Sequence, residues 1–356
     1  MTAKKGTIDA EKLTNFTIRA LQKMGVPDEG ARITADMLVL TDLRGVDSHG
    51  VARLASLYIK GLQEGRINPT PKPEISSQAL ATAVMDGDRG LGFVVGHQAM
   101  TEAMRRAETA GAGFVSVRNS THFGASAVYA MMALEHDMIG ISMTDATLAV
   151  APPGSSKPGI GTNPLAVAVP TGNKPPFIFD MATSVVAIGK LEIARREGHS
   201  LPVGWVIDED GLPITDPDKR VRGGGGLLPL GGTPTLRSYK GFGLAMVVEI
   251  LCSVLAGESA TISRNSPEVR NPTGHFFGAL NVANFSPLET FKKSMDEMIE
   301  ATQNLPRLPG VEKVYVAGDY ETEIEKNRRA NGIPLHPAVV SSLKDMAEEL
   351  GVEYDL

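Results

Sequence analysis

The sequence predicts an α/β fold in which helices are layered on a β-sheet. From about residue 79 to residue 198, short runs of apolar and β-branched residues alternate with amphipathic helical patterns. That order is typical of a sheet covered by helices. The first 65 residues show helical patterns only. A helical segment therefore precedes the sheet, and the proline-rich stretch NPTPKPE at 68–74 is the first candidate boundary between them.

Three helices are predicted in the N-terminal segment. Residues 9–24 repeat apolar side chains three and four positions apart, as one face of a helix requires. The second helix covers 27–43 and begins with proline and two acids, which the helix dipole favours. The third covers 48–65, with Ser48 as its N-cap.

The rest of the chain alternates between strands and helices. Predicted strands cover 81–88, 113–119, 138–146, 165–170, 177–182, 275–285 and 311–319. Predicted helices cover 96–110, 125–137, 185–198, 241–257, a segment after Pro287, 321–331 and 337–350. Residues 199–239 have no clear periodicity and include Gly223–Gly226, which predicts a long loop.

Composition excludes several classes of function. The 356 residues carry a net charge of -6 with no concentrated Lys and Arg, which argues against a nucleic-acid partner. The single cysteine, Cys252, excludes an internal disulfide and a multi-thiolate metal site and suits a reducing cytoplasm. The most apolar stretch, 241–257, is interrupted by Glu249 and is short for a bilayer. We therefore expect a cytoplasmic protein without a secretory signal, a membrane partner or a metal site.

The sharpest local feature is DLRGVDSHGVARL at 42–54. With Ser48 as N-cap, His49 lies in the first turn of a helix and Arg53 follows four residues later on the same face. A proton carrier and a carboxylate-binding guanidinium would then face one volume, and the amides of the helix start would lower the pKa of His49. Oxidation of a 2-hydroxy acid needs this combination. The alternative is a surface histidine and arginine that only cap and solvate a helix.

Three further motifs could bind ligands, and each has a structural alternative. His122, in RNSTHFGAS, follows a predicted strand, where α/β sheets present ligand-binding groups, but it could also be a turn histidine. Asp180 ends an apolar strand and could orient a histidine or hold a cofactor, or it could cap the helix near Val185. Lys240 before Gly241 could bind a phosphate at a helix start, although such glycine-rich starts are common.

The usual dinucleotide fingerprint is absent. No strict GxGxxG follows a strand and opens a helix, and GLGFVVG at 90–96 has one residue too many between its last two glycines. The sequence also shows no metal-ligand cluster, no P-loop and no serine nucleophile elbow. A nucleotide would therefore bind without a Rossmann motif.

Taken in order, the motifs resemble the malate/L-lactate dehydrogenase family, which has its own non-Rossmann fold. The resemblance runs from about Asp9 to Val352 and rests on DLRGVDSHGVARL, NSTHFG, MIGISMTDA, GIGTNPLAVAVPT, DMATSVVAIGKLE, LLPLGG, KGFGL and HFFGALN. It implies a three-layer α/β/α domain with a mixed seven-stranded sheet over 75–287. It also implies a helical domain built from 1–74 and 288–356, and a homodimer.

The resemblance also implies roles for individual residues. His49 and His122 compete as the proton donor/acceptor, and Asp180 orients a histidine. The substrate-binding residues implied are Ser48, Arg53, Thr162 and Asn163, with Arg44 as a second cation for a dicarboxylate. The cofactor-binding residues implied are Asp180, Met181, Ala182, Thr183, Ser184, Lys240, Gly241, Ala317, Gly318, Asp319 and Ala146.

One departure from the family pattern concerns the cofactor. Relatives usually read TNS where this chain reads TDA at 144–146, so Ala146 replaces a cofactor-contacting serine and Asp145 adds a carboxylate. A carboxylate near an adenosine 2′-phosphate would be repulsive. This predicts NAD as the cofactor, with NADP as the alternative.

The predicted function is hydride transfer between NAD(P) and a small 2-hydroxy or 2-oxo acid. Malate and oxaloacetate lead, because DMATSVVAIGKLE and LLPLGG look closest to archaeal-type malate enzymes. The alternative substrates are lactate, sulfolactate, ureidoglycolate, a keto sugar acid and a cyclic imino acid. From another class, a binding protein that has lost catalysis is disfavoured by the intact set of candidate residues.

Overall fold

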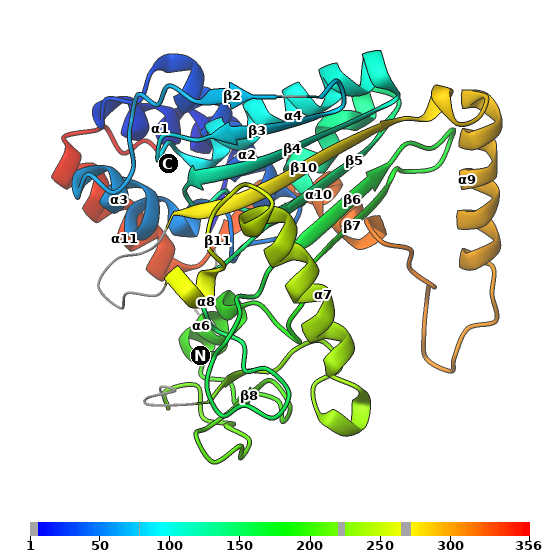
Figure 1. The fold of residues 1–356 in the computed structure, drawn as a ribbon. Coiled ribbons are helices and arrows are strands. Elements are labelled where there is room, and N and C mark those ends of the chain that lie inside the picture. The colour runs from blue at the N-terminus through cyan, green and yellow to red at the C-terminus, as the bar shows by residue number, and fades with distance from the viewer. Residues whose placement is uncertain (1–5, 78, 220–224, 265–271) are drawn as a thin grey trace.

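A mixed seven-stranded sheet forms the centre of the protein (Figure 1). The computed structural model describes residues 6–77, 79–219, 225–264 and 272–356. The strands lie in the order β2 (Glu74–Ser76), β3 (Thr82–Asp86), β4 (Ala112–Ser120), β10 (Thr273–Asn281), β5 (Met138–Thr144), β6 (Leu165–Val169) and β7 (Phe177–Met181). Only β3 and β4 pair in parallel, and the other neighbouring strands are antiparallel. The expected mixed, non-Rossmann sheet is confirmed.

Helices cover both faces of this sheet, as Figure 1 shows. Because side chains alternate along a strand, neighbouring residues of β10 serve opposite faces. Phe277 packs into the core beneath α4 (Gly92–Ala110), whereas Phe276 packs with Val248 and Cys252. Those two residues belong to α7 (Tyr239–Glu249) and to the π-helical turn that continues it, Ile250–Val254. The three-layer arrangement follows from this alternation.

The two ends of the chain come together beside the sheet. Asp9 caps α1 (Ala10–Lys23) by accepting a hydrogen bond from the Lys12 amide, and α2 (Asp28–Leu43) packs against α1. Near the other terminus lie α9 (Leu288–Gln303), α10 (Asp319–Asn331) and α11 (Pro337–Leu350). Here α11 contacts α1, and β1 (Gly6–Ile8) pairs with β11 (Ile333–Leu335). This pairing supports a helical domain from both ends, whose boundaries at 74/75 and 287/288 remain a proposal.

Three predicted elements differ from the structure. The helix predicted over 125–137 forms as the short α5 (Ala127–Ala130) followed by a 3-10 segment over Met131–His136. The helix predicted over 48–65 begins only at Val51, as a 3-10 turn that continues as a π-helical segment over Leu54–Ile59 and as α3 (Lys60–Gln63). The strand predicted over 311–319 does not form. A strand needs a continuous ladder of hydrogen bonds to a neighbouring strand. This segment is joined to β7 by one backbone hydrogen bond, from the Ile178 amide to the Ala317 carbonyl.

The aperiodic segment 199–239 contains little regular structure. A two-stranded ladder joins β8 (Val206–Ile207) and β9 (Gly226–Leu227), and a short 3-10 turn covers Pro234–Leu236. The segment 199–239 begins just after α6 (Ile188–Glu197). The short helix α8 (Thr261–Arg264) follows α7 later in the chain. The expected Gly223–Gly226 run lies partly outside the described residues, which omit 220–224.

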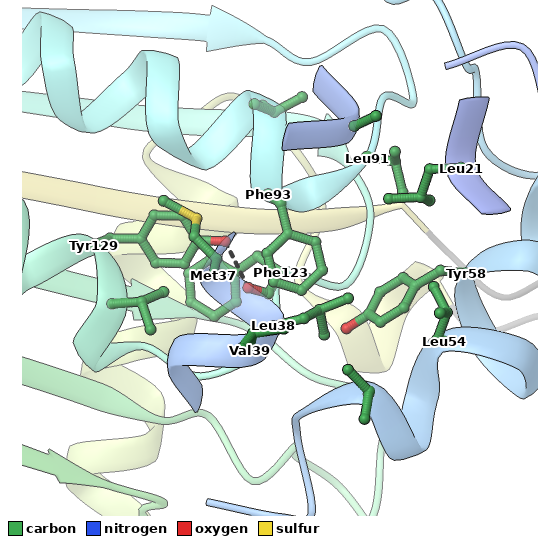
Figure 2. Packing of buried hydrophobic residues seen from close by; sticks show 14 of the residues in the cluster. Leu21, Met37, Leu38, Val39, Leu54, Tyr58, Leu91, Phe93, Phe123 and Tyr129 are labelled. Atoms are coloured by element: carbon green, nitrogen blue, oxygen red, sulfur yellow. Dashed lines mark hydrogen bonds between the residues drawn. The ribbon is translucent and has the colours of Figure 1, made fainter. Parts of the chain in front are cut away.

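A buried aromatic core connects the helical segment to the sheet (Figure 2). Tyr58 meets Phe93 edge to face with ring centroids 5.1 Å apart, and Phe123 stacks on Tyr129 at 4.7 Å. Aromatic pairs of this kind add roughly 0.5–1.5 kcal/mol each beyond the area they bury. The core therefore fixes the loop after β4 relative to the segment that follows α2, and these two segments carry the candidate histidines.

Candidate active site

The turn after α2 carries Ser48 and His49. The Val51 amide donates to Asp42 Oδ2 at 2.8 Å. A Cβ at Gly50 would lie 2.0 Å from Asp42 Oδ1, so the turn closes only with glycine there. Gly50, not Ser48, precedes the first helical turn, and the expected N-cap is therefore wrong. The Ser48 hydroxyl instead lies 2.8 Å from Nδ1 of its neighbour His49.

His49 is neutral at physiological pH. Burial is the main cause that lowers the pKa of its imidazole to about 4, and the positive charge of Arg53 lowers it further. The direction agrees with the expectation from the sequence, but the cause does not, since no helix begins at His49. A histidine with so low a pKa donates and accepts hydrogen bonds readily and resists becoming an imidazolium.

His122 lies directly beside His49, although 73 positions separate them in the chain. Their rings are nearly parallel, 10° apart, with centroids separated by 5.8 Å. Nδ1 of His122 lies 2.7 Å from the Tyr58 hydroxyl and accepts a hydrogen bond from the Gly124 amide at 3.2 Å. The structure thus brings the two competing histidines into one site and holds the second through its Nδ1.

Tyr58 is a site residue that sequence reasoning missed. Its position suits the apolar face of the helix predicted over 48–65, and the pattern indicated a core residue. It is fully buried, which raises the pKa of its hydroxyl well above the usual value. The available signal was chemical: a buried tyrosine needs a partner for its hydroxyl, where Leu or Phe needs none.

The two candidate arginines have different environments. Arg53 donates from Nε to the Ser48 carbonyl at 2.9 Å and pairs through Nη1 with Glu192 at 3.1 Å, and its side chain remains partly accessible. Arg44 is 4% exposed and pairs with Glu325 at 2.9 Å. Its Nη2 is buried and has no hydrogen-bond partner among the described residues, so the expectation that Arg44 binds a second substrate carboxylate stays a prediction. Arg53 remains the accessible cation beside His49.

Asp180 lies near the end of β7 and connects this strand to the segment that follows His122. Its carboxylate accepts a hydrogen bond from the Ala127 amide at 2.8 Å. The residue keeps solvent contact on one side, yet the protein packed around its carboxyl raises the pKa to about 6, mainly by desolvation. The nearby charge of Glu321 raises this pKa further, and that of Arg44 lowers it. Asp180 is therefore mostly ionised at neutral pH.

The residues after Asp180 divide into accessible and structural ones. Met181 and Ala182 are partly exposed. Thr183 and Ser184 are buried, and their hydroxyls donate to the Thr162 and Val186 carbonyls. The last two therefore secure the loop, and a cofactor contact through their side chains is not supported.

Asn163 is also structural. It is completely buried, its Oδ1 accepts from the Ala146 amide, and its Nδ2 donates to the Ala245 carbonyl and to Glu249. The expectation that it binds substrate is corrected, since its amide is saturated by protein groups. Its neighbour Thr162 is partly exposed and offers its carbonyl to the Thr183 amide.

The remaining expected cofactor residues lie beside β7 or beside the loop that follows it. The Leu230 amide donates to the Thr183 carbonyl, and Gly241 packs against the Leu230 backbone, which places exposed Lys240 at the start of α7 nearby. Ala317 bonds to Ile178 of β7, and Gly318 packs against the same residue. Asp319 is 8% exposed and accepts from Gln303 and from the Val316 amide, so its carboxyl supports the loop.

Asp145 does not face a cofactor. It is 4% exposed and is held by Arg264 at 2.9 Å, by the Ser253 hydroxyl and by the Gly274 amide. Burial raises the pKa of its carboxyl to about 6. A carboxylate engaged in this way cannot repel a 2′-phosphate at the protein surface. The argument for NAD over NADP from this residue is therefore wrong.

Asp42 gives the turn that carries His49 a measurable pH dependence. Burial, and to a lesser degree Asp47, raise the pKa of its carboxyl to about 8. A pKa raised on folding stabilises the protein below the ordinary value and loses that stabilisation as pH rises from about 4 through 8. Asp145 and Asp180 act in the same direction but only up to about pH 6.

We expect the melting temperature of the wild type to fall between pH 6.5 and pH 9 more than that of Asp42→Asn, which has no proton to lose there. Calorimetry across this range measures the difference. The exposed Asp210→Asn should follow the wild type. Parallel curves for the wild type and Asp42→Asn would show that Asp42 ionises without cost.

The described residues offer neither a metal-binding group nor a membrane-spanning helix. Within them, no three His, Cys, Asp or Glu side chains are grouped to hold a metal ion. The helices that the structure describes include none long and apolar enough to cross a membrane.

Comparison with known proteins gives consistent matches over nearly the whole chain. A family model described as malate/L-lactate dehydrogenase matches residues 8–344. A malate dehydrogenase of Pyrococcus abyssi is 43% identical over 97% of this chain and 95% of its own. An L-sulfolactate dehydrogenase of Methanocaldococcus jannaschii is 40% identical over 97% of each chain. The crystal structure of malate dehydrogenase from Entamoeba histolytica superposes with a TM-score of 0.95 at 35% identity, covering 99% of this chain and 100% of that one.

Proposed function

The chain belongs to the malate/L-lactate dehydrogenase family, and on that premise we propose that it interconverts malate and oxaloacetate with a nicotinamide cofactor. As a member of that family it is an oxidoreductase. The observation that carries the proposal is the parallel pair His49 and His122 with Arg53 beside it. The choice of malate is supported by relatives that carry that name. We place the enzyme in the cytoplasm, where its single cysteine stays reduced.

The end of β7 fits a nicotinamide cofactor. Asp180 offers an accessible carboxylate, an acceptor suited to a carboxamide N–H or a ribose hydroxyl, and Met181 and Ala182 are partly exposed beside it. Lys240 supplies an exposed cation at the start of α7 for a pyrophosphate. When bound, the nicotinamide supplies or accepts the hydride, and the protein provides position and protons. Since Asp145 gives no support to NAD over NADP, both cofactors belong in the test.

We assign proton transfer to His122. A general base must become an imidazolium when it takes the hydroxyl proton of malate, and its pKa should lie near the working pH. His49, whose pKa is about 4, is poorly suited to that role. The Tyr58 hydroxyl lies 2.7 Å from Nδ1 of His122 and fixes the ring. In the reactive tautomer Nδ1 carries a proton and donates it to the Tyr58 oxygen, so that Nε2 is the free nitrogen that accepts the hydroxyl proton. In the reverse direction, Nε2 protonates the oxygen that oxaloacetate develops as its carbonyl is reduced.

We assign carboxylate binding to Arg53, with Ser48 and His49 beside it. The guanidinium offers a fixed fork that matches a carboxylate, and its Nε is already anchored on the Ser48 carbonyl. Neutral His49 can donate to the substrate without bringing a second positive charge next to Arg53. These residues orient the C2 hydroxyl toward His122.

The test is a panel of 2-oxo acids with each reduced cofactor. Purified protein is mixed with NADH or NADPH and oxaloacetate, pyruvate, sulfopyruvate or a cyclic imino acid, and absorbance at the nicotinamide band is followed. The proposal expects the highest kcat/KM with oxaloacetate. A higher kcat/KM with sulfopyruvate or the imino acid would support hydride transfer but show that malate is not the preferred product. If no acid causes oxidation of the reduced cofactor, the proposed function is refuted.

We also propose a homodimer that forms through α7. Along one face of this helix and its π-helical continuation, large apolar side chains are each 45–57% exposed: Tyr239, Met246, Val247, Ile250 and Val254. An apolar stripe of this kind marks a protein interface, and a two-fold dimer is the commonest way to cover it. We expect a dimer by analytical ultracentrifugation and a monomer for Ile250→Glu, whereas Ile75→Glu on β2 should remain dimeric. A monomeric wild type would contradict this proposal.

A further inference from the structure

Arg53 is already paired with a carboxylate of its own chain. Glu192, on α6, approaches Nη1 of Arg53 to 3.1 Å, while Nε of the same guanidinium donates to the Ser48 carbonyl. Because Nε is committed to the backbone, Nη1 and Nη2 are the edge that a bidentate carboxylate must use. Glu192 occupies part of that edge. A substrate carboxylate and Glu192 therefore compete for one side of Arg53.

The helix that carries Glu192 is seated directly on the site. A Cβ at Gly189 would lie 2.7 Å from Ser48 Cβ and 3.3 Å from Arg53 Nη2, so the first turn of α6 touches both residues. Only glycine permits this close approach. The contact brings Glu192, three residues later, over the guanidinium. α6 thus covers Ser48 and Arg53.

The rest of α6 is loosely held. Of its ten residues only Gly189 is buried. Its residues Ile193, Arg196 and Glu197 line a small hollow of about 50 Å³ that also borders Asp47 and Ala52. Segments with few buried contacts are those that open at low cost. The helix therefore has little packing to lose when Glu192 moves.

We propose that Glu192 is a specificity-determining residue that holds Arg53 in the unliganded enzyme and yields it to the substrate carboxylate. This inference rests on the proposed function, since it takes Arg53 as the carboxylate ligand. The pair is partly solvated, with Glu192 51% exposed at its side chain, and such pairs are weak enough to exchange. Because of this competition, only a ligand that carries a carboxylate displaces Glu192 from Arg53.

The test measures binding of oxamate, a non-reacting monocarboxylate shaped like a 2-oxo acid. Oxamate is titrated by calorimetry into the enzyme saturated with NADH or, if the enzyme prefers it, NADPH. Glu192→Gln removes the competing charge, and we expect oxamate to bind about two- to fivefold more tightly, the range that a partly exposed ion pair allows. The matched control is Glu197→Gln on the same helix, whose carboxylate lies near His199 at the surface. It should bind oxamate as the wild type does.

Two results would overturn the inference. Oxamate affinity that is unchanged or weaker in Glu192→Gln would show that Glu192 does not compete for Arg53. An equal gain in Glu197→Gln would assign the effect to net charge rather than to the pair. Arg53→Gln separates this failure from failure of the proposed site: if it binds oxamate as the wild type does, Arg53 is not the carboxylate ligand at all.

Discussion

Replacing His122 with alanine is expected to lower kcat by about 10²- to 10⁴-fold with oxaloacetate, the range by which a positioned acid or base accelerates a reaction. KM should change little, because Arg53, the residue that we propose binds the carboxylate, lies on another segment. The reason is chemical: without the imidazole no group at that position protonates the developing alkoxide. Steady-state oxidation of the reduced cofactor measures the loss, and an unchanged melting temperature would show that the aromatic core around Phe123 survives.

His49→Ala is the control that assigns the roles. Since the pKa of about 4 keeps His49 neutral, its removal costs hydrogen bonds and not the mobile proton. We expect a loss of roughly tenfold in kcat/KM, as one or two hydrogen bonds of about 1 kcal/mol would give. If His49→Ala loses more kcat than His122→Ala, the two roles are reversed.

Replacing Arg53 with glutamine is expected to raise KM for oxaloacetate by about 10- to 100-fold. Hydrogen bonds to a charged group are worth roughly 1.5–3 kcal/mol, and glutamine removes the charge while keeping a polar side chain. The effect should fall on KM more than on kcat, because the acid/base and the cofactor residues are untouched. Initial rates over a wide range of oxaloacetate concentration measure it.

The control for Arg53 is Arg195→Gln on α6, which removes the same charge from an exposed position. Its KM should stay within twofold of the wild type, since distant surface charges are screened by salt. A comparable rise in KM for both variants would assign the effect to net charge. A normal KM for Arg53→Gln would show that Arg53 does not bind the substrate carboxylate.

The residue types of the site could be read from the sequence, but their grouping could not. Local spacing indicated that His49 and Arg53 belong together, and the contact between His49 and His122 depends on packing between segments far apart in the chain. The family resemblance supplied that grouping, and the ring geometry agrees with it. Tyr58 and Glu192 were missed because their partners are likewise distant in sequence.

The corrected residues share one physical cause. A buried polar side chain saturated by protein partners and a ligand-binding side chain have the same residue type, so sequence alone does not separate them. Asn163 and Asp145 each meet their partners inside the protein. Only their burial, which depends on the whole fold, shows that they cannot reach a substrate or a cofactor.

Local signals also explain which elements were predicted well. For α1 the cap residue and the apolar period agree, and its limits lie within one residue of the prediction. At Ser48 the local cap chemistry competes with a longer-range bond, and the Val51 amide pairs with Asp42 instead. The segment 311–319 has a strand-like pattern, but a strand also needs a partner edge, which a sequence pattern does not reveal.

The most direct test of the central claim is transfer of a labelled hydride. Oxaloacetate is reduced by the enzyme with NADH or NADPH that carries deuterium at both C4 positions, and the malate formed is analysed by mass spectrometry. The account predicts malate with one deuterium at C2 for each cofactor oxidised. Unlabelled malate, or cofactor oxidation without malate, would contradict it.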